Sequence, residues 1–117
     1  MLVVDDNKDL LDLYTRIFTR HKYTNVFQAE DGDKAIKLFS ELNEKPDFIL
    51  MDYRMPIMNG IDAAKELFRI KDDNIIIMMS ADTSIIDEAL KVGIKGFIKK
   101  PIEIGELFSQ INEILAK

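Results

Sequence analysis

The chain has no cysteine, no tryptophan and a single histidine. Without cysteine it forms no disulfide framework and offers no thiolate metal site. No segment has the basic start, apolar stretch and cleavage site of a secretion signal. The longest apolar runs, such as residues 75–79, are too short to cross a bilayer. We therefore expect a cytoplasmic protein without a membrane span.

Positive charge is also scarce. The 117 residues carry a formal net charge of −5, and the lysines are scattered, with Lys99 and Lys100 the only adjacent pair. Binding to nucleic acid needs a basic surface that displaces counterions from the phosphates. We therefore expect no direct contact with DNA or RNA. A chain of this length has room for one compact domain.

Short apolar runs typical of β-strands alternate with longer segments whose apolar residues recur at helical spacing. The expected strands cover 2–4, 25–29, 48–51, 75–79 and 96–98, and the expected helices lie within 10–18, 35–42, 61–70, 85–90 and 104–115. Residues 75–79 are apolar on both faces, as in strands buried within parallel sheets. Strict alternation in one small domain predicts a parallel sheet with right-handed crossovers and helices on both faces.

Acidic and polar residues occupy the positions where these strands end. They are Asp5 and Asp6 after the first strand, Asp52 after the third, Ser80 after the fourth and Lys100 after the fifth. The carboxyl ends of parallel strands share one edge of the sheet, which is where open α/β sheets bind their ligands. We expect these five side chains to meet there.

Three carboxylates at one edge indicate a cation site, because crowded carboxylates repel one another and the pKa of at least one rises. Mg²⁺ suits the site, with Mn²⁺ as an alternative, because it takes oxygen ligands and leaves positions for phosphate oxygens. The formal charges of three acids, Lys100 and a divalent cation cancel. A carboxylate screened by a metal and a lysine can accept a phosphoryl group, so Asp52 is the candidate acceptor. No glycine-rich loop follows the first strand, which argues against a nucleotide-binding loop.

Four motifs resemble those of the receiver domains of two-component response regulators, in particular the single-domain chemotaxis regulators. The motifs are Asp5-Asp6, Asp52 with residues 55–60, Ser80-Ala81, and residues 97–101. They occur in the family's order and span essentially the whole chain. The resemblance implies one receiver domain over residues 1–117. It also implies a flavodoxin-like α/β fold, with a doubly wound five-stranded parallel sheet in the order 2-1-3-4-5 and five flanking helices.

The resemblance implies roles in signalling for four residues. Asp52 would be the phosphoacceptor, Ser80 and Lys100 would contact the phosphoryl group, and Phe97 would be the switch aromatic. The phosphoryl group would come from the phosphohistidine of a histidine kinase or phosphotransfer protein. The face made by the fourth helix, fifth strand and fifth helix would then bind a downstream protein or a second copy of the chain. Such a chain is a signalling switch, catalysing only its own phosphorylation and dephosphorylation.

The resemblance also assigns the metal ligands. Asp5, Asp6 and Asp52 would hold Mg²⁺ together with the backbone carbonyl of Arg54. Pro101 is a candidate for a cis peptide bond. From the residues alone, either Asp5 or Asp6 could instead cap the first helix, although capping needs only one acid and two are present.

Two further positions vary within the family. Arg54 lies two residues after Asp52, and Asp82 lies two residues after Ser80. We hypothesise that Arg54 and Asp82 form an ion pair across the mouth of the site and partly screen the acyl phosphate from water.

Two other functions remain open at this point. A pseudo-receiver would bind a partner constitutively without being phosphorylated, but the intact acids, Ser80 and Lys100 argue against it. A phosphatase with an aspartyl nucleophile would need a second acid two residues after the nucleophile, to donate a proton. Arg54 occupies that position.

Overall fold

The computed structural model describes residues 1–116, in which strands and helices alternate. The strands are β1 (Leu2–Val4), β2 (Phe27–Ala29), β3 (Ile49–Asp52), β4 (Ile76–Ser80) and β5 (Gly96–Lys99). The helices are α1 (Lys8–Arg20), α2 (Gly32–Glu41), α3 (Gly60–Ile70), α4 (Ile86–Val92) and α5 (Ile104–Ala116), and a short 3-10 turn, η1 (Thr83–Ile85), precedes α4.

The strands form one parallel sheet in the order β2-β1-β3-β4-β5. This confirms the predicted doubly wound, flavodoxin-like fold and its strand order. The register also aligns the ends of the strands. Val4 pairs with Met51, so Asp5 and Asp52 follow at the same level on neighbouring strands. Ser80 pairs with Lys99, which brings the end of β4 beside Lys100.

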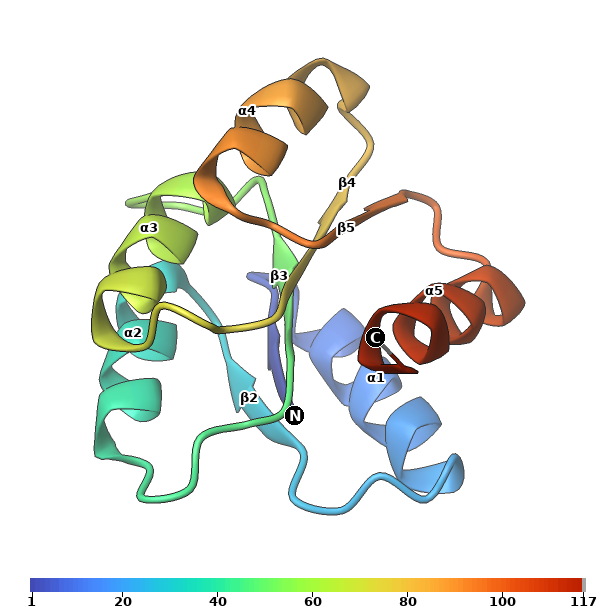
Figure 1. Ribbon diagram of the computed structural model, residues 1–117. Coiled ribbons are helices and arrows are strands. Elements are labelled where there is room, and N and C mark those ends of the chain that lie inside the picture. The colour runs from blue at the N-terminus through green and yellow to red at the C-terminus, as the bar shows by residue number, and fades with distance from the viewer. Residues whose placement is uncertain (117) are drawn as a thin grey trace.

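Helices cover both faces of the sheet. In Figure 1, α1 and α5 lie on one side, and α2, α3 and α4 lie on the other. Alternate residues of each strand point to opposite faces. Leu2 and Val4 therefore pack with Phe39 of α2 and its neighbours, whereas Val3 packs with Phe18 of α1. The helices thus leave only the edges of the sheet open, and the ends of the strands are accessible there.

The strand bounds differ from the predicted ones in informative places. The second strand begins at Phe27 and not at residue 25, because Asn25 has a φ of 55°, a left-handed conformation that ends an extended segment. β3 and β4 each begin and end one residue later than predicted, so Asp52 and Ser80 are the last residues of their strands. Both side chains are therefore held by the sheet itself.

Gly60 fixes the turn that follows Asp52. Its N–H donates to the Tyr53 carbonyl at 2.7 Å. A Cβ atom at this position would lie 2.4 Å from the backbone oxygen of Asp52, so no other residue fits without moving β3. Among residues 1–116, no helix combines the length and the apolar character needed to span a membrane.

Candidate functional site

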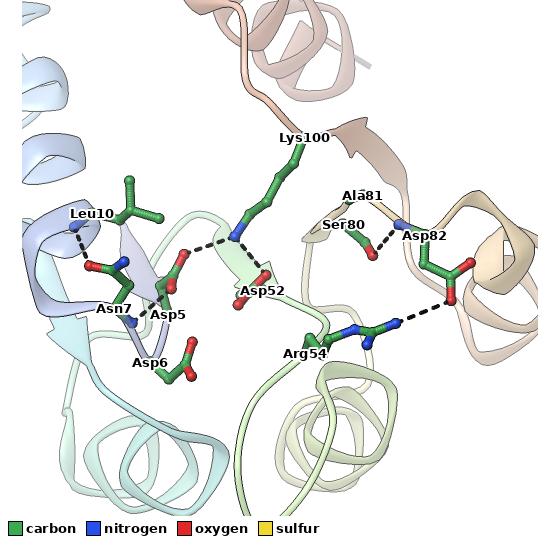
Figure 2. A pocket seen from close by; sticks show the side chains of 10 residues that line it. All are labelled: Asp5, Asp6, Asn7, Leu10, Asp52, Arg54, Ser80, Ala81, Asp82 and Lys100. Atoms are coloured by element: carbon green, nitrogen blue, oxygen red, sulfur yellow. Dashed lines mark hydrogen bonds and ion pairs between the residues drawn. The ribbon is translucent and has the colours of Figure 1, made fainter.

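A pocket of about 450 Å³ opens at the carboxyl edge of the sheet. Figure 2 shows that the five predicted side chains gather in it from β1, β3, β4 and the segment after β5. They are Asp5, Asp6, Asp52, Ser80 and Lys100. Arg54 and Asp82 also line the pocket, opposite the pair of acids from β1. The structure therefore brings together residues that are up to 95 positions apart in the sequence.

Lys100 bridges the two buried acids (Figure 2). Its Nζ lies 3.0 Å from Oδ1 of Asp52 and 3.3 Å from Oδ2 of Asp5. Asp5 is 1% exposed and Asp52 is 4% exposed. The Lys100 backbone N–H donates to the Ser80 carbonyl at 2.9 Å, and the peptide bond between Lys100 and Pro101 is cis. Lys100 is thus placed by β4 and neutralises one of two buried negative charges.

The three acids can supply ligands to one cation. One carboxylate oxygen from each of Asp5, Asp6 and Asp52 lies within 4.8 Å of the others, and Asp6 is the exposed member of the three. Oxygen donors are the ligands that Mg²⁺ prefers, usually with several waters retained. The donor set therefore fits Mg²⁺, and the exposed side at Asp6 leaves room for waters.

The pKa values show how unbalanced the charges are. Burial raises the pKa of Asp52 to about 6; the hydrogen bond from Lys100 opposes this rise, and the charges of Asp5 and Asp6 add to it. Burial alone would lower the pKa of Lys100, but its hydrogen bond to Asp52 and the charges of Asp52 and Asp5 raise it. Lys100 therefore stays charged, whereas Asp52 needs further positive charge to remain ionised at low energetic cost.

Ser80 presents a hydroxyl group beside these charges. It is 4% exposed, and its Oγ accepts the backbone N–H of Asp82 at 2.9 Å. Because a hydroxyl both accepts and donates, the Ser80 O–H remains available to an oxygen atom in the pocket.

Arg54 and Asp82 face each other at the mouth of the pocket (Figure 2). The Arg54 guanidinium lies 3.8 Å from Oδ2 of Asp82, and the two side chains are 82% and 34% exposed. Oδ1 of Asp82 accepts both the backbone N–H and the hydroxyl of Ser84, at 2.9 and 2.6 Å. Asp82 is therefore held in place by the start of η1, and Arg54 is the more exposed partner.

Sequence reasoning overlooked two residues at the site. Leu10 lines the pocket, although its helical spacing had assigned it only to the apolar stripe of the first helix. Asn7, and neither Asp5 nor Asp6, caps α1, with its side-chain oxygen accepting the Leu10 N–H at 3.2 Å. The signal for both was their position in the first turn after Asp6.

Phe97 lies outside the pocket. It is half-buried on β5 and packs on the sheet face covered by α2, α3 and α4. It is thus one strand away from Ser80, because Ser80 is on β4 and Phe97 pairs with Met78 of that strand.

The model of the response regulator receiver domain family matches residues 1–112 of the chain. The chain belongs to this family. It is 36% identical over 116 residues to the chemotaxis protein CheY of Thermotoga maritima, an alignment that covers 97% of this chain and 95% of that protein. It is also 35% identical over 107 residues to the putative two-component response regulator ARR21 of Arabidopsis thaliana, covering 92% of this chain but 17% of that longer protein.

The fold has close counterparts among solved structures of receivers. CheY in the CheX-CheY-BeF₃-Mg²⁺ complex of Borrelia burgdorferi is 26% identical, with a TM-score of 0.92, and the match covers 99% of this chain and 88% of that one. Receiver domains belong to two-component systems, where they act as signalling switches and interact with histidine kinases and phosphotransfer proteins. They bind Mg²⁺ at an acidic pocket, and the cluster of Asp5, Asp6 and Asp52 fits this property.

Proposed function

We propose that residues 1–117 work as one receiver domain in which Asp52 accepts a phosphoryl group from the phosphohistidine of a histidine kinase or phosphotransfer protein. The observation that carries the proposal is the contact of Lys100 Nζ with Asp52 and Asp5, in a pocket that also holds Asp6. Anionic phosphoryl donors approach a carboxylate only where positive charge offsets the repulsion. Lys100 supplies one such charge, and the acids attract a second.

In the transfer step an Asp52 carboxylate oxygen attacks the phosphorus atom, and the P–N bond to the donor imidazole breaks. The imidazole keeps the electron pair of that bond and leaves neutral when its other nitrogen carries a proton. The Lys100 ammonium then pairs with a phosphoryl oxygen, and the Ser80 O–H donates to another. Both side chains lie in the pocket beside Asp52, so neither has to come from another part of the fold.

Asp5, Asp6, Asp52 and the Arg54 backbone carbonyl would hold Mg²⁺, or Mn²⁺ in its place. The ion supplies positive charge that offsets the charges of the acids and of the incoming phosphoryl group. The 4.8 Å grouping of the carboxylate oxygens and the raised pKa of Asp52, which burial causes, support this assignment.

The same proposal includes a route for the signal. A phosphoryl group that draws the Ser80 hydroxyl toward Asp52 competes with the hydrogen bond from the Asp82 N–H, at the start of the segment that leads into α4. Phe97 lies on the neighbouring strand, is only half-buried, and would be the aromatic side chain that responds. The face made by α4, β5 and α5 would then bind a downstream protein or a second copy of the chain. We keep the cytoplasm as the compartment, since a chain without cysteine lacks the disulfides common in secreted domains.

The ion pair of Arg54 and Asp82 is proposed to slow hydrolysis of the acyl phosphate. Because the pair is exposed, it is worth less than about 1 kcal/mol, which limits its effect on the rate to about fivefold. Arg54→Ala is expected to lose its phosphoryl group faster than the wild type, within that limit. Arg69→Ala is the matched control, since Arg69 is an exposed arginine paired with Glu66 on α3. An unchanged rate of dephosphorylation in Arg54→Ala would refute this role.

The acceptor assignment is tested with phosphoramidate and MgCl₂, followed by intact mass spectrometry. The wild type is expected to gain one phosphoryl group, and the adduct should not form in EDTA. Asp52→Asn is expected to form no adduct, because an amide is not a nucleophile for this transfer. Asp73→Asn removes an exposed acid that pairs with Lys71 before the start of β4, at the opposite edge of the sheet from the pocket, and should react like the wild type.

A wild type that gains no phosphoryl group under any condition would favour a pseudo-receiver that binds its partner constitutively. An adduct that persists in Asp52→Asn would place the acceptor elsewhere and would equally contradict the proposal.

A further inference from the structure

An apolar groove runs beside the acceptor pocket and shares Leu10, Ala81 and Lys100 with it. Tyr14 of α1 and Pro101 also line the groove. Tyr14 lies one helical turn after Leu10 and is 5% exposed, among the core residues between α1, α5 and the sheet. Tyr14, although nearly buried, therefore lines the same groove as Lys100.

The Tyr14 hydroxyl has no protein partner. Within residues 1–116 it makes no hydrogen bond to another residue, and because no buried side-chain oxygen among these residues lacks a partner, the hydroxyl itself must reach the solvent of the groove. Burial raises its pKa to about 12, the charge of Lys100 opposes this rise, and the charges of Asp5 and Asp52 add to it. The phenol is therefore neutral at working pH and lies within electrostatic reach of the three charged groups of the pocket.

The Lys100 ammonium group has one more N–H donor than it has acceptors among the described residues. It carries three N–H donors. Two are directed to carboxylates, Asp52 at 3.0 Å and Asp5 at 3.3 Å, and no third acceptor contacts it among the described residues. One donor without an acceptor and one phenol oxygen without a donor therefore line the same groove. A water between them would satisfy both, at little entropic cost.

We propose that Tyr14 is a positioning residue for Lys100, and that its hydroxyl accepts the third N–H of the ammonium group through one water molecule in the groove. The proposal rests on the proposed function, in which Lys100 acts on the phosphoryl group. The contact limits the motion of the ammonium group when an incoming phosphoryl group draws it away from Asp5. Tyr14 itself does not touch the reacting atoms.

The kinetic test compares two variants that each lose one phenol oxygen. Tyr14→Phe is expected to slow phosphorylation by phosphoramidate roughly threefold to tenfold at saturating donor and Mg²⁺, as for a lost water-mediated contact that orients a catalytic group. Tyr23→Phe is the matched control, because Tyr23 packs in the aromatic cluster with Phe18 and Phe48. It is expected to react at the wild-type rate. Both variants should keep the wild-type melting temperature within a few degrees and bind Mg²⁺ as tightly.

A double-mutant cycle separates positioning from a general effect on the fold. In a Lys100→Gln background, Tyr14→Phe is expected to cause no further slowing, since the group that it positions is gone. The same fold reduction in both backgrounds would overturn the proposal. So would a Tyr14→Phe variant that reacts as fast as the wild type.

A second measurement needs no phosphoryl transfer. The ¹H–¹⁵N signal of the Lys100 ammonium group reports its hydrogen exchange in the metal-free protein, and Tyr14→Phe is expected to speed that exchange at least about threefold by removing the bound partner. Equal exchange in the two proteins would overturn the role of Tyr14. If Tyr14→Phe speeds the exchange of the Lys100 ammonium group but the wild type gains no phosphoryl group, the proposed function alone is refuted.

Discussion

Buried polar groups have different partners at the two edges of the sheet, the amino edge where the strands begin and the carboxyl edge where they end. At the amino edge, Asn74 is 2% exposed and its amide donates to the Leu67 carbonyl at 3.0 Å. Lys45 donates to the last carbonyls of α2, at 2.5 Å to Phe39 and 2.7 Å to Leu42. At the carboxyl edge, buried Asp5 and Asp52 share a single lysine.

The polar contacts at the amino edge serve the stability of the fold, whereas those at the carboxyl edge serve the function of the site. Polar groups at the amino edge are paired with backbone carbonyls that need partners in any case, so these contacts stabilise the folded chain. Those at the carboxyl edge leave a net negative charge on two buried carboxylates, which is costly until a cation or a ligand arrives. One edge should therefore lose stability when its polar groups are removed, and the other should gain it.

The largest expected effect on stability is that of Asp52→Asn in the metal-free protein. The pKa of Asp52 is raised from 3.8 to about 6, so the folded state binds this proton more tightly than the unfolded state. Ionisation of Asp52 therefore destabilises the fold above pH 6, by up to about 3 kcal/mol, and costs nothing below pH 4. In urea titrations at pH 7.5, Asp52→Asn should gain about 1 to 3 kcal/mol, a figure that already includes the contact with Lys100, because that contact lowers the pKa of Asp52.

Two controls sharpen this result. At pH 3.5 wild type and Asp52→Asn should have nearly equal stability, because the carboxyl is then neutral in the folded protein and mostly neutral in the unfolded protein. Mg²⁺ at pH 7.5 should stabilise the wild type more than the variant and narrow the gap. A variant that is less stable than the wild type at pH 7.5 without metal would break the contrast between the two edges.

Asn74→Ala is the converse experiment at the amino edge. It removes one of the two donors to the Leu67 carbonyl, which still accepts the Lys71 N–H at 3.0 Å, so the free energy of unfolding should fall by about 0.5 to 1.5 kcal/mol. Phosphorylation by phosphoramidate and Mg²⁺ affinity should stay as in the wild type. Asn112→Ala, at an exposed position of α5, should change stability by less than about 0.5 kcal/mol. A loss of Mg²⁺ affinity in Asn74→Ala would show that the two edges are coupled.

The sequence predicted the carboxyl edge better than the amino edge, for a physical reason. The alternation of strands and helices and the polar residues at the strand ends were enough to predict a parallel sheet and the gathering of Asp5, Asp52 and Lys100, whereas the strand order came from the resemblance to receiver domains. The partners of Asn74 and Lys45 depend on where α2 and α3 end relative to the next strand, which no local pattern encodes. The roles assigned to the gathered residues stay predictions until phosphorylation is measured.

Residues with a positive φ angle also differ between the two edges. Near the amino edge, Lys22 and Asn25 have φ angles of 69° and 55°, and neither is β-branched; in the loop after β3, Ile57 has a φ of 75°. Asparagine adopts this region readily, whereas a β-branched residue does so only with strain. The Met58 N–H donates to the Pro56 carbonyl at 2.9 Å, so Ile57 is the centre of a γ-turn with positive φ. Its side chain is 78% exposed and therefore gains little from packing.

The smallest expected effect on the free energy of unfolding comes from replacing Ile57, with Asn25 as the comparison. Ile57→Gly should relieve a left-handed strain of about 1 to 2 kcal/mol and lose about 0.5 to 1 kcal/mol to the greater freedom of glycine when unfolded. The net gain in the free energy of unfolding should be about 0.5 to 1 kcal/mol, measured by urea titration. Ile57→Val keeps the branch at Cβ and should gain nothing, and Asn25→Gly should gain nothing because asparagine is already relaxed there. If Asn25→Gly stabilised the chain as much as Ile57→Gly, the strain would not be particular to the edge that carries the site.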